Sequence, residues 1–158
     1  IGDKAFSSCK SLKSITIPNS VTTIGENAFS FSGLTSIEIP DSVTSIGASA
    51  FYACSALTGI TISGAIKTIQ ERTFESCTNL SSIKVPDDVK TIDKYVFLAC
   101  TSLTSITIGS KITTIDEYAF WNCTSLTDIY INKAEGSLTV PSGEYTTIHW
   151  NSTGPTTV

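Results

Sequence analysis

A block of about 23 residues repeats along the chain, with apolar residues at fixed places and polar residues between them. Its consensus reads L-x-x-I-x-I-P-x-x-V-x-x-I-x-x-x-A-F-x-x-C-x-x. Six of the seven phenylalanines recur at intervals of 23, 22, 23, 23 and 23 residues: Phe6, Phe29, Phe51, Phe74, Phe97 and Phe120. Leucines keep the same period, at Leu12, Leu34, Leu57, Leu80, Leu103 and Leu126. A fixed period of this length is the sequence signature of a repeat protein.

The pattern divides the chain into a repeat domain, residues 1–131, and a C-terminal piece, residues 132–158, that lacks the pattern. Full copies span residues 12–33, 34–56, 57–79, 80–102 and 103–125. A half copy stands at each end, over residues 1–11 and 126–131. The last unit of a stack exposes apolar core and an unpaired strand edge unless something covers it. We therefore predict that residues 132–158 form a cap through Leu138, Val140, Ile148 and Trp150.

Each copy predicts one coil of a solenoid. In the copy 34–56, "LTSIEIP" alternates apolar and polar residues and predicts a short strand, which Pro40 ends because proline donates no ladder hydrogen bond. "SVTSIG" predicts a second extended segment, and "ASAFYAC" predicts a single helical or 3₁₀ turn. Burying one large apolar group is worth roughly 1.5–3 kcal/mol, whereas ordering one backbone residue costs roughly 1–2 kcal/mol. One coil cannot fold alone, so stability must come from stacking.

The repeat resembles the BspA-type leucine-rich repeat of bacterial and some protist surface proteins. "IGENAF" (24–29) and "IGASAF" (46–51) fit that pattern best, while Gln70, Asp93 and Asp116 replace its glycine in other copies. The resemblance implies an α/β leucine-rich-repeat solenoid, right-handed and curved, with a parallel β-sheet on its concave face. It places short strands and single helical or 3₁₀ turns on the convex face. It also implies a cell-surface or secreted protein that acts in adhesion or recognition and is not an enzyme.

Composition narrows the possible partners. The net charge is -4 and the pI about 4.8, and no Lys/Arg cluster is present, which argues against nucleic acid and anionic membranes. No apolar run approaches the roughly 20 residues that cross a bilayer, and no signal peptide is recognisable. The chain has no Met and opens within a repeat at Ile1, so we expect a piece of a longer precursor. An uncapped N-terminal end would expose core and predicts self-association.

Five cysteines follow the repeat phenylalanine by three residues: Cys9, Cys54, Cys77, Cys100 and Cys123. Cysteines one coil apart form a row, which cannot close the tetrahedron of a zinc site. Disulfides along the row would be strained, because neighbouring Cβ atoms point the same way. A catalytic thiolate needs a nearby base, and His149, the one histidine, is far away in the sequence. We predict a buried, reduced ladder of small apolar side chains, with Phe31 or Ser32 in the slot of the shortened copy.

Two surfaces are candidates for ligand binding. On the concave face the outward strand positions include Glu38, Lys84, Asp128 and Tyr130, of which the last two are the most ligand-like. The alternative is a solvated face whose threonines favour β-structure. On the convex face we predict an exposed apolar strip, the candidate binding patch, formed by Tyr52, Tyr95, Leu98, Tyr118 and Trp121. The alternative there is packing between adjacent turns.

The sequence favours a non-catalytic protein without a cofactor or a metal site. It shows one histidine, no Gly-rich phosphate loop, no metal-ligand spacing and no paired carboxylates in a fixed motif. We expect the partner to be a protein or a glycan, with no direct insertion into a membrane. The alternative function is a structural spacer or stalk that holds another part of a larger surface protein away from the cell.

Overall fold

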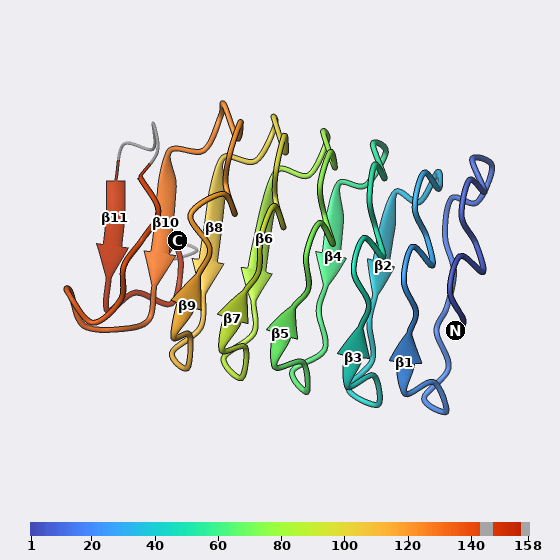
Figure 1. The fold of residues 1–158 in the computed structure, drawn as a ribbon, viewed down its shortest axis with the longest axis horizontal. Coiled ribbons are helices and arrows are strands. Elements are labelled where there is room, and N and C mark those ends of the chain that lie inside the picture. The colour runs from blue at the N-terminus through green and yellow to red at the C-terminus, as the bar shows by residue number, and fades with distance from the viewer. Residues whose placement is uncertain (143–146, 156–158) are drawn as a thin grey trace.

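The chain forms a solenoid of stacked coils in the computed structural model, which describes residues 1–142 and 147–155 (Figure 1). Parallel strands of successive coils lie side by side on two faces. The broad face carries β2 (Ser36–Glu38), β4 (Gly59–Thr61), β6 (Ser82–Val85), β8 (Ser105–Ile108), β10 (Asp128–Ile131) and β11 (Thr147–Trp150). The narrow face carries β1 (Thr23–Ile24), β3 (Ser45–Ile46), β5 (Thr68–Ile69), β7 (Thr91–Ile92) and β9 (Thr114–Ile115). The predicted parallel-strand solenoid is confirmed.

Strand pairing is in register, so equivalent positions of the repeat face one another. Ile37 lies opposite Ile60, and Ile106 lies opposite both Ile83 and Ile129. Hydrogen-bonded pairing is interrupted once on each face, between β4 and β6 and between β3 and β5. Both interruptions border the coil of residues 57–79. The broad face therefore consists of two sheets, β2–β4 and β6–β8–β10–β11, which lie edge to edge.

The third side of each coil differs from the predicted helical or 3₁₀ turn. Residues 3–8, 26–31, 48–53, 71–76, 94–99 and 117–122 form six turn segments, and no helix occurs among the residues that the structure describes. The α/β class and its helical turns are therefore not found, and this part of the sequence prediction is corrected. No helix among these residues has the length and apolar character needed to cross a membrane.

Left-handed residues explain why the turn segments are not helical. In the segment around Phe51, Ser49 has φ 56° and Ala53 has φ 53°. The Phe51 N–H consequently points to the next coil and donates to the Thr73 carbonyl at 3.0 Å. The Tyr52 N–H instead closes a turn on the Ser49 carbonyl. In a helix the N–H groups point along the helix axis, not toward a neighbouring coil. The left-handed residues, each costing roughly 1–2 kcal/mol, therefore allow the inter-coil hydrogen bonds.

The core is a set of columns that run along the stack. The repeat phenylalanines form one of them, with neighbouring ring centroids 5.3 to 5.9 Å apart and ring planes inclined by 6° to 17°. Phe29, Phe51, Phe74 and Phe97 are fully buried, as are Leu34, Leu57, Leu80 and Leu103. A residue in a column contacts mainly its counterparts in the coils before and after it. Packing is therefore a property of adjacent repeats and not of one coil.

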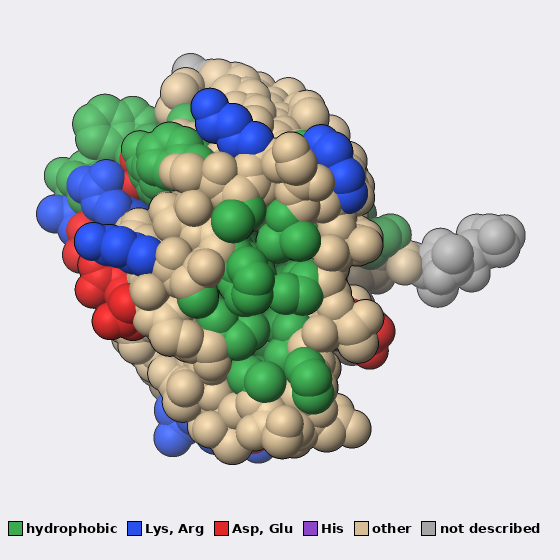
Figure 2. All heavy atoms as spheres, turned by 90° about the vertical axis from the view of Figure 1, so that its right-hand side faces the viewer, with side chains coloured by type: hydrophobic (Ala, Val, Ile, Leu, Met, Phe, Trp, Pro, Cys, Tyr) green, Lys and Arg blue, Asp and Glu red, His purple; other side chains and the backbone are tan. Residues whose placement is uncertain are grey.

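The N-terminal end leaves part of this core uncovered. Figure 2, which looks at that end, shows a strip of apolar side chains in its centre. The first coil contributes five partly buried apolar residues that pack on the core from one side only, Ile1, Phe6, Leu12, Ile15 and Val21. The self-association expected for this end stays a prediction.

The C-terminal piece continues the broad face with one more strand. β11 pairs in parallel with β10, and Ile148 lies opposite Ile129. Leu138, Val140, Ile148 and Trp150 are partly buried against the core. Residues 143–146 and 156–158 of the predicted cap lie outside the described residues. These contacts are those that a cap would make.

Candidate functional site

Four of the five cysteines occupy a buried column, which we call the thiol ladder: Cys54, Cys77, Cys100 and Cys123. Each thiol donates to the carbonyl of the repeat phenylalanine in the preceding coil, at Sγ–O distances of 3.0, 3.2, 3.1 and 2.9 Å. All are free thiols. The ladder therefore satisfies backbone carbonyls inside the stack.

The thiols of the ladder are unreactive at neutral pH. Burial raises the pKa of Cys77 and of Cys100 well above the usual range, and it raises the pKa of Cys123 to about 12. The thiolate, which is the nucleophile and metal ligand, is therefore scarce at neutral pH. No group of three or more potential metal ligands occurs within residues 1–142 and 147–155.

Cys9 differs from the other cysteines and from the prediction. It is exposed, because no other coil among the described residues covers it on its N-terminal side. In the shortened copy the slot of the missing cysteine is taken by Ser32, which is buried, with its Oγ 3.4 Å from the Cys54 Sγ. Phe31 lies on the surface and is 48% exposed.

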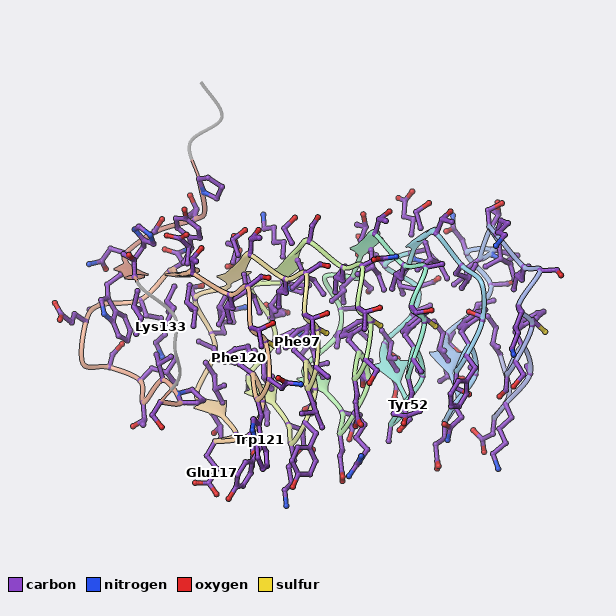
Figure 3. All side chains as sticks on the ribbon, turned by 90° about the horizontal axis from the view of Figure 1, so that it is seen from above. Tyr52, Phe97, Glu117, Phe120, Trp121 and Lys133 are labelled. Carbon is purple, nitrogen blue, oxygen red and sulfur yellow. The ribbon has the colours of Figure 1, made fainter. Side chains whose placement is uncertain are left out.

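Three aromatic residues and two cations meet on the turn side of the last coils, and we call them the aromatic cluster: Arg72, Lys94, Tyr95, Tyr118 and Trp121. The Tyr118 ring lies 5.6 Å from the Tyr95 ring and 5.4 Å from the Trp121 ring. Trp121 is 59% exposed. Figure 3 shows it with Glu117 at the outer edge, whereas the labelled Phe97 and Phe120 point into the stack.

The two cations fix the tyrosines of the aromatic cluster. The Arg72 guanidinium lies 4.8 Å from the Tyr95 ring centre, and Lys94 Nζ lies 4.9 and 5.5 Å from the Tyr95 and Tyr118 rings. Contacts of this kind contribute about 0.5–1 kcal/mol at exposed sites. Arg72 is itself held by an ion pair with the buried Glu75 at 2.8 Å. Glu117 raises the pKa of Tyr118, so the phenol stays protonated at neutral pH.

The sequence prediction found the aromatic members of this cluster and missed its cations. Arg72, Tyr95 and Tyr118 stand two residues before the repeat phenylalanine and so form one column, which the spacing alone could have revealed. Lys94 stands one place earlier in the same copy as Tyr95. Its position over two rings requires the coils to be stacked.

The remaining members of the predicted strip lie apart from the cluster. Tyr52 packs edge-on against Phe31, with ring centroids 5.2 Å apart and planes at 77°. Figure 3 shows Tyr52 on the same edge as Trp121 but well separated from it. Glu75 holds the position between Tyr52 and Leu98 in their column, and Leu98 is half-buried. The structure thus contains two aromatic groups in place of one continuous strip.

The four residues that the sequence predicted as candidates on the concave face divide into two pairs. Asp128 and Tyr130 lie on β10, where both contact His149 of β11. The His149 Nε2 atom is 2.8 Å from the Asp128 Oδ1 atom, and its ring stacks on Tyr130 at 4.3 Å with planes inclined by 9°. The hydrogen bonds from His149 and Thr127 lower the pKa of Asp128. Sequence reasoning missed His149 here, because only strand pairing brings β11 to β10.

Glu38 and Lys84 lie beside a hollow on the broad face. The hollow has a volume of about 550 Å³ and is lined by residues of β2, β4 and β6, together with Ser14, Ile15 and Thr58. Gly59 of β4 lies among its lining residues, between Ser36 and Ser82 of the neighbouring coils. Both the hollow and the aromatic cluster are surfaces on which a ligand could bind without a chemical reaction.

Three solved structures of leucine-rich repeat proteins are similar to this chain. A leucine rich cell surface protein of Faecalibacterium prausnitzii is 37% identical, with a TM-score of 0.75 over 78% of this chain and 33% of that chain. A leucine-rich repeat protein of Bacteroides capillosus is 32% identical, with a TM-score of 0.52 over 61% of this chain and 75% of that one. One of Bacteroides ovatus, at 24% identity and a TM-score of 0.63, shares the fold over 95% of this chain and 51% of that one.

The repeat itself matches a known family. No curated protein matches the chain. The chain spans about a third of the F. prausnitzii structure, so it corresponds to part of that protein. The model of the BspA type leucine rich repeat region matches residues 1–138 in 6 copies, which is most of the sequence. Together with the stacked coils of the structure, this match means that the chain belongs to the BspA-type leucine-rich repeat family.

Proposed function

We propose that this chain is a non-catalytic recognition module of a cell-surface or secreted protein. In this proposal it binds a protein or a glycan through the aromatic cluster. The observation that supports the proposal is the exposure of Trp121, which is 59% accessible although its ring contacts that of Tyr118. An ordered aromatic ring that stays exposed is ready to bury a large apolar area at small entropic cost.

The composition of the aromatic cluster supports recognition. Trp, Tyr and Arg are the residues that contribute most often to binding hot spots. Here Trp121 and Tyr118 offer flat apolar faces, and Lys94 and Arg72 supply positive charge beside them. A sugar ring or an aromatic side chain could stack on such faces, and an acidic group of the same ligand could pair with a cation.

The absence of a catalytic role is inferred from the state of the reactive groups. Four cysteines are buried, protonated thiols, and each donates its hydrogen to a carbonyl. His149 is stacked on Tyr130 and hydrogen-bonded to Asp128, which orients it toward the sheet surface. The leucine-rich-repeat scaffold is moreover one that typically serves for binding.

The surface location rests on similarity. The F. prausnitzii protein is described as a leucine rich cell surface protein, and 78% of this chain aligns with it. The same location is proposed for this chain. A spacer or stalk is the second candidate function, and the uniform phenylalanine column along the stack favours it.

A binding experiment separates the two functions. The chain would be tested by biolayer interferometry against immobilised extracellular matrix proteins and a glycan array, together with Tyr118→Ala and Trp121→Ala. Phe31→Ala is the matched control, because Phe31 is also an exposed aromatic residue of a turn segment but lies outside the aromatic cluster. We expect both cluster variants to weaken binding by about tenfold or more, which corresponds to about 1.4 kcal/mol, with the control unchanged. Failure of the chain to bind any partner at micromolar concentration would favour the spacer. Equal binding by all variants would refute the role of the aromatic cluster.

A further inference from the structure

We propose that the hollow around Gly59 is a second binding site, on the broad face, for a short oligosaccharide that carries a carboxylate group. The site is separate from the aromatic cluster, which lies on the turn segments. It consists of Ser36 and Glu38 of β2, Gly59 and Thr61 of β4, and Ser82 and Lys84 of β6.

The hollow exists because one side chain is missing from an outward-facing column. Strand register aligns Ser36 with Gly59, and Ser82 with Ser105 and Asp128, so Gly59 is the one position among these without a side chain. A Cβ atom built on Gly59 would meet nothing within 4 Å. Gly59 is also not required for a left-handed backbone, since its φ is not positive. Its effect is to leave open space on the sheet surface.

The gap in strand pairing lies beside the same hollow. β4 and β6 belong to different hydrogen-bonded sheets, so the backbone of β4 is unpaired on the side that faces β6. Ile60 of β4 is partly exposed, whereas its register partner Ile37 and the equivalent residues Ile83 and Ile106 of later coils are at most 5% exposed. The floor of the hollow therefore offers an apolar side chain and free backbone groups together.

The charges at the rim are available to a ligand. Glu38 and Lys84 are exposed, and neither forms an ion pair within residues 1–142 and 147–155. They stand at the same register position two coils apart, with Thr61 between them. Two strand spacings put their backbones roughly 10 Å apart. This span is about that of a disaccharide, and the volume of about 550 Å³ lies in the range of small-molecule sites.

Hydroxyl chemistry favours a sugar. Serine and threonine hydroxyls both donate and accept hydrogen bonds, as sugar hydroxyls do, and Ser36, Thr61 and Ser82 line the hollow. Glu38 can accept hydrogen bonds from two sugar hydroxyls, and Lys84 can pair with a carboxylate. Ile60 can contact the apolar face of a ring. An acidic oligosaccharide uses all of these groups, whereas a neutral one leaves the Lys84 ammonium unpaired.

An added peptide strand does not fit the gap. The coils that carry β4 and β6 remain stacked, because the Phe74 N–H donates to the Val96 carbonyl at 3.0 Å on the turn side. A strand inserted between β4 and β6 would have to separate them by about a further 4.8 Å. A peptide gains affinity from backbone pairing at an open sheet edge, and this gap lies inside the stack.

Filling the hollow tests the site without harming the fold. Gly59→Val places a β-branched side chain in open space on a strand, and Ser105→Val places the same side chain at the equivalent position of β8, outside the hollow. Acidic ligands would first be selected on an array of uronic-acid and sialic-acid oligosaccharides and their neutral counterparts. Both variants and the parent chain would then be titrated with the selected oligosaccharides and their neutral counterparts by isothermal calorimetry. Thermal unfolding would show that both variants remain folded.

We expect acidic oligosaccharides to bind and their neutral counterparts to bind at least tenfold more weakly. Gly59→Val should abolish this binding, Lys84→Gln should weaken it about tenfold, and Ser105→Val should leave it unchanged. Trp121→Ala should also leave it unchanged, so failure of this site is distinguishable from failure of the aromatic cluster. The proposal is overturned if no acidic oligosaccharide binds in preference to its neutral counterpart, or if folded Gly59→Val binds as the parent does.

Discussion

Replacing Phe74 with alanine perturbs the centre of the phenylalanine column. The ring is fully buried and stacks on Phe51 and on Phe97, at 5.6 Å in each case. Truncating a buried phenylalanine costs about 3–5 kcal/mol. Aromatic pairs contribute about 0.5–1.5 kcal/mol beyond area burial, so the loss of two pairs puts Phe74→Ala at the upper end of that range. The cavity would also lie between coils, where stacking supplies most of the stability.

Phe6→Ala is the matched control, because the chemical change is the same and the surroundings are not. Phe6 is partly buried and has a single stacked neighbour, Phe29, at 5.3 Å. We expect Phe6→Ala to lower the free energy of unfolding by about 1–2 kcal/mol, since only part of its apolar surface is removed from water.

Urea unfolding, followed by circular dichroism and by tryptophan fluorescence, measures both losses. Trp121 and Trp150 both lie toward the C-terminus, so fluorescence reports on the last coils while circular dichroism reports on the whole stack. A defect at Phe74 weakens coupling between the two halves, and we expect the two transitions to separate in Phe74→Ala but not in Phe6→Ala. Equal losses in the two variants, or a loss below about 2 kcal/mol for Phe74→Ala, would refute the nearest-neighbour account of stability.

Three further predictions concern the thiols and the ion pairs. A thiol reagent should label Cys9 rapidly in the native protein and five cysteines after denaturation without reductant; a count of three or one in the denatured chain would reveal disulfides. Cys77→Ser should lower the free energy of unfolding by about 1–3 kcal/mol, because a hydroxyl replaces a buried thiol. Cys9→Ser should leave it unchanged, because Cys9 is exposed, and equal denaturation curves for the two variants would contradict this. Asp88 bridges Lys111 and Lys67, and these two cations lower the pKa of Asp88 from an ordinary value of 3.8 to about 2. Because the pKa is lower in the folded state, the bridge stabilises the fold above about pH 4, and this stability is lost as the pH falls toward 2. The parent should therefore lose stability over this range more steeply than Asp88→Asn, and parallel profiles in acid-titrated urea melts would count against the bridge.

The period of the apolar residues determined the main architecture. Phe29, Phe51 and Phe74 recur at a spacing that only a coil of matching length can align, so the sequence predicted the stacked coils and their buried columns. The same reasoning located the aromatic members of the cluster, because Tyr95 and Tyr118 share a repeat position. It did not yield the turn geometry, since the left-handed residues include Ser49 and Ala53, whose identities give no sign of positive φ.

The features that depend on neighbouring coils were decided by the tertiary structure alone. Cys9 and Cys77 occupy the same position of the repeat, but Cys9 is exposed and Cys77 is buried. The difference arises because this position is buried only where a neighbouring coil covers it. His149 meets Asp128 only after β11 pairs with β10, across a segment without the repeat pattern. A hydrophobic period specifies which residues face inward in every coil. The contacts between coils, including the hollow at Gly59, depend on the particular side chains that stacking brings together.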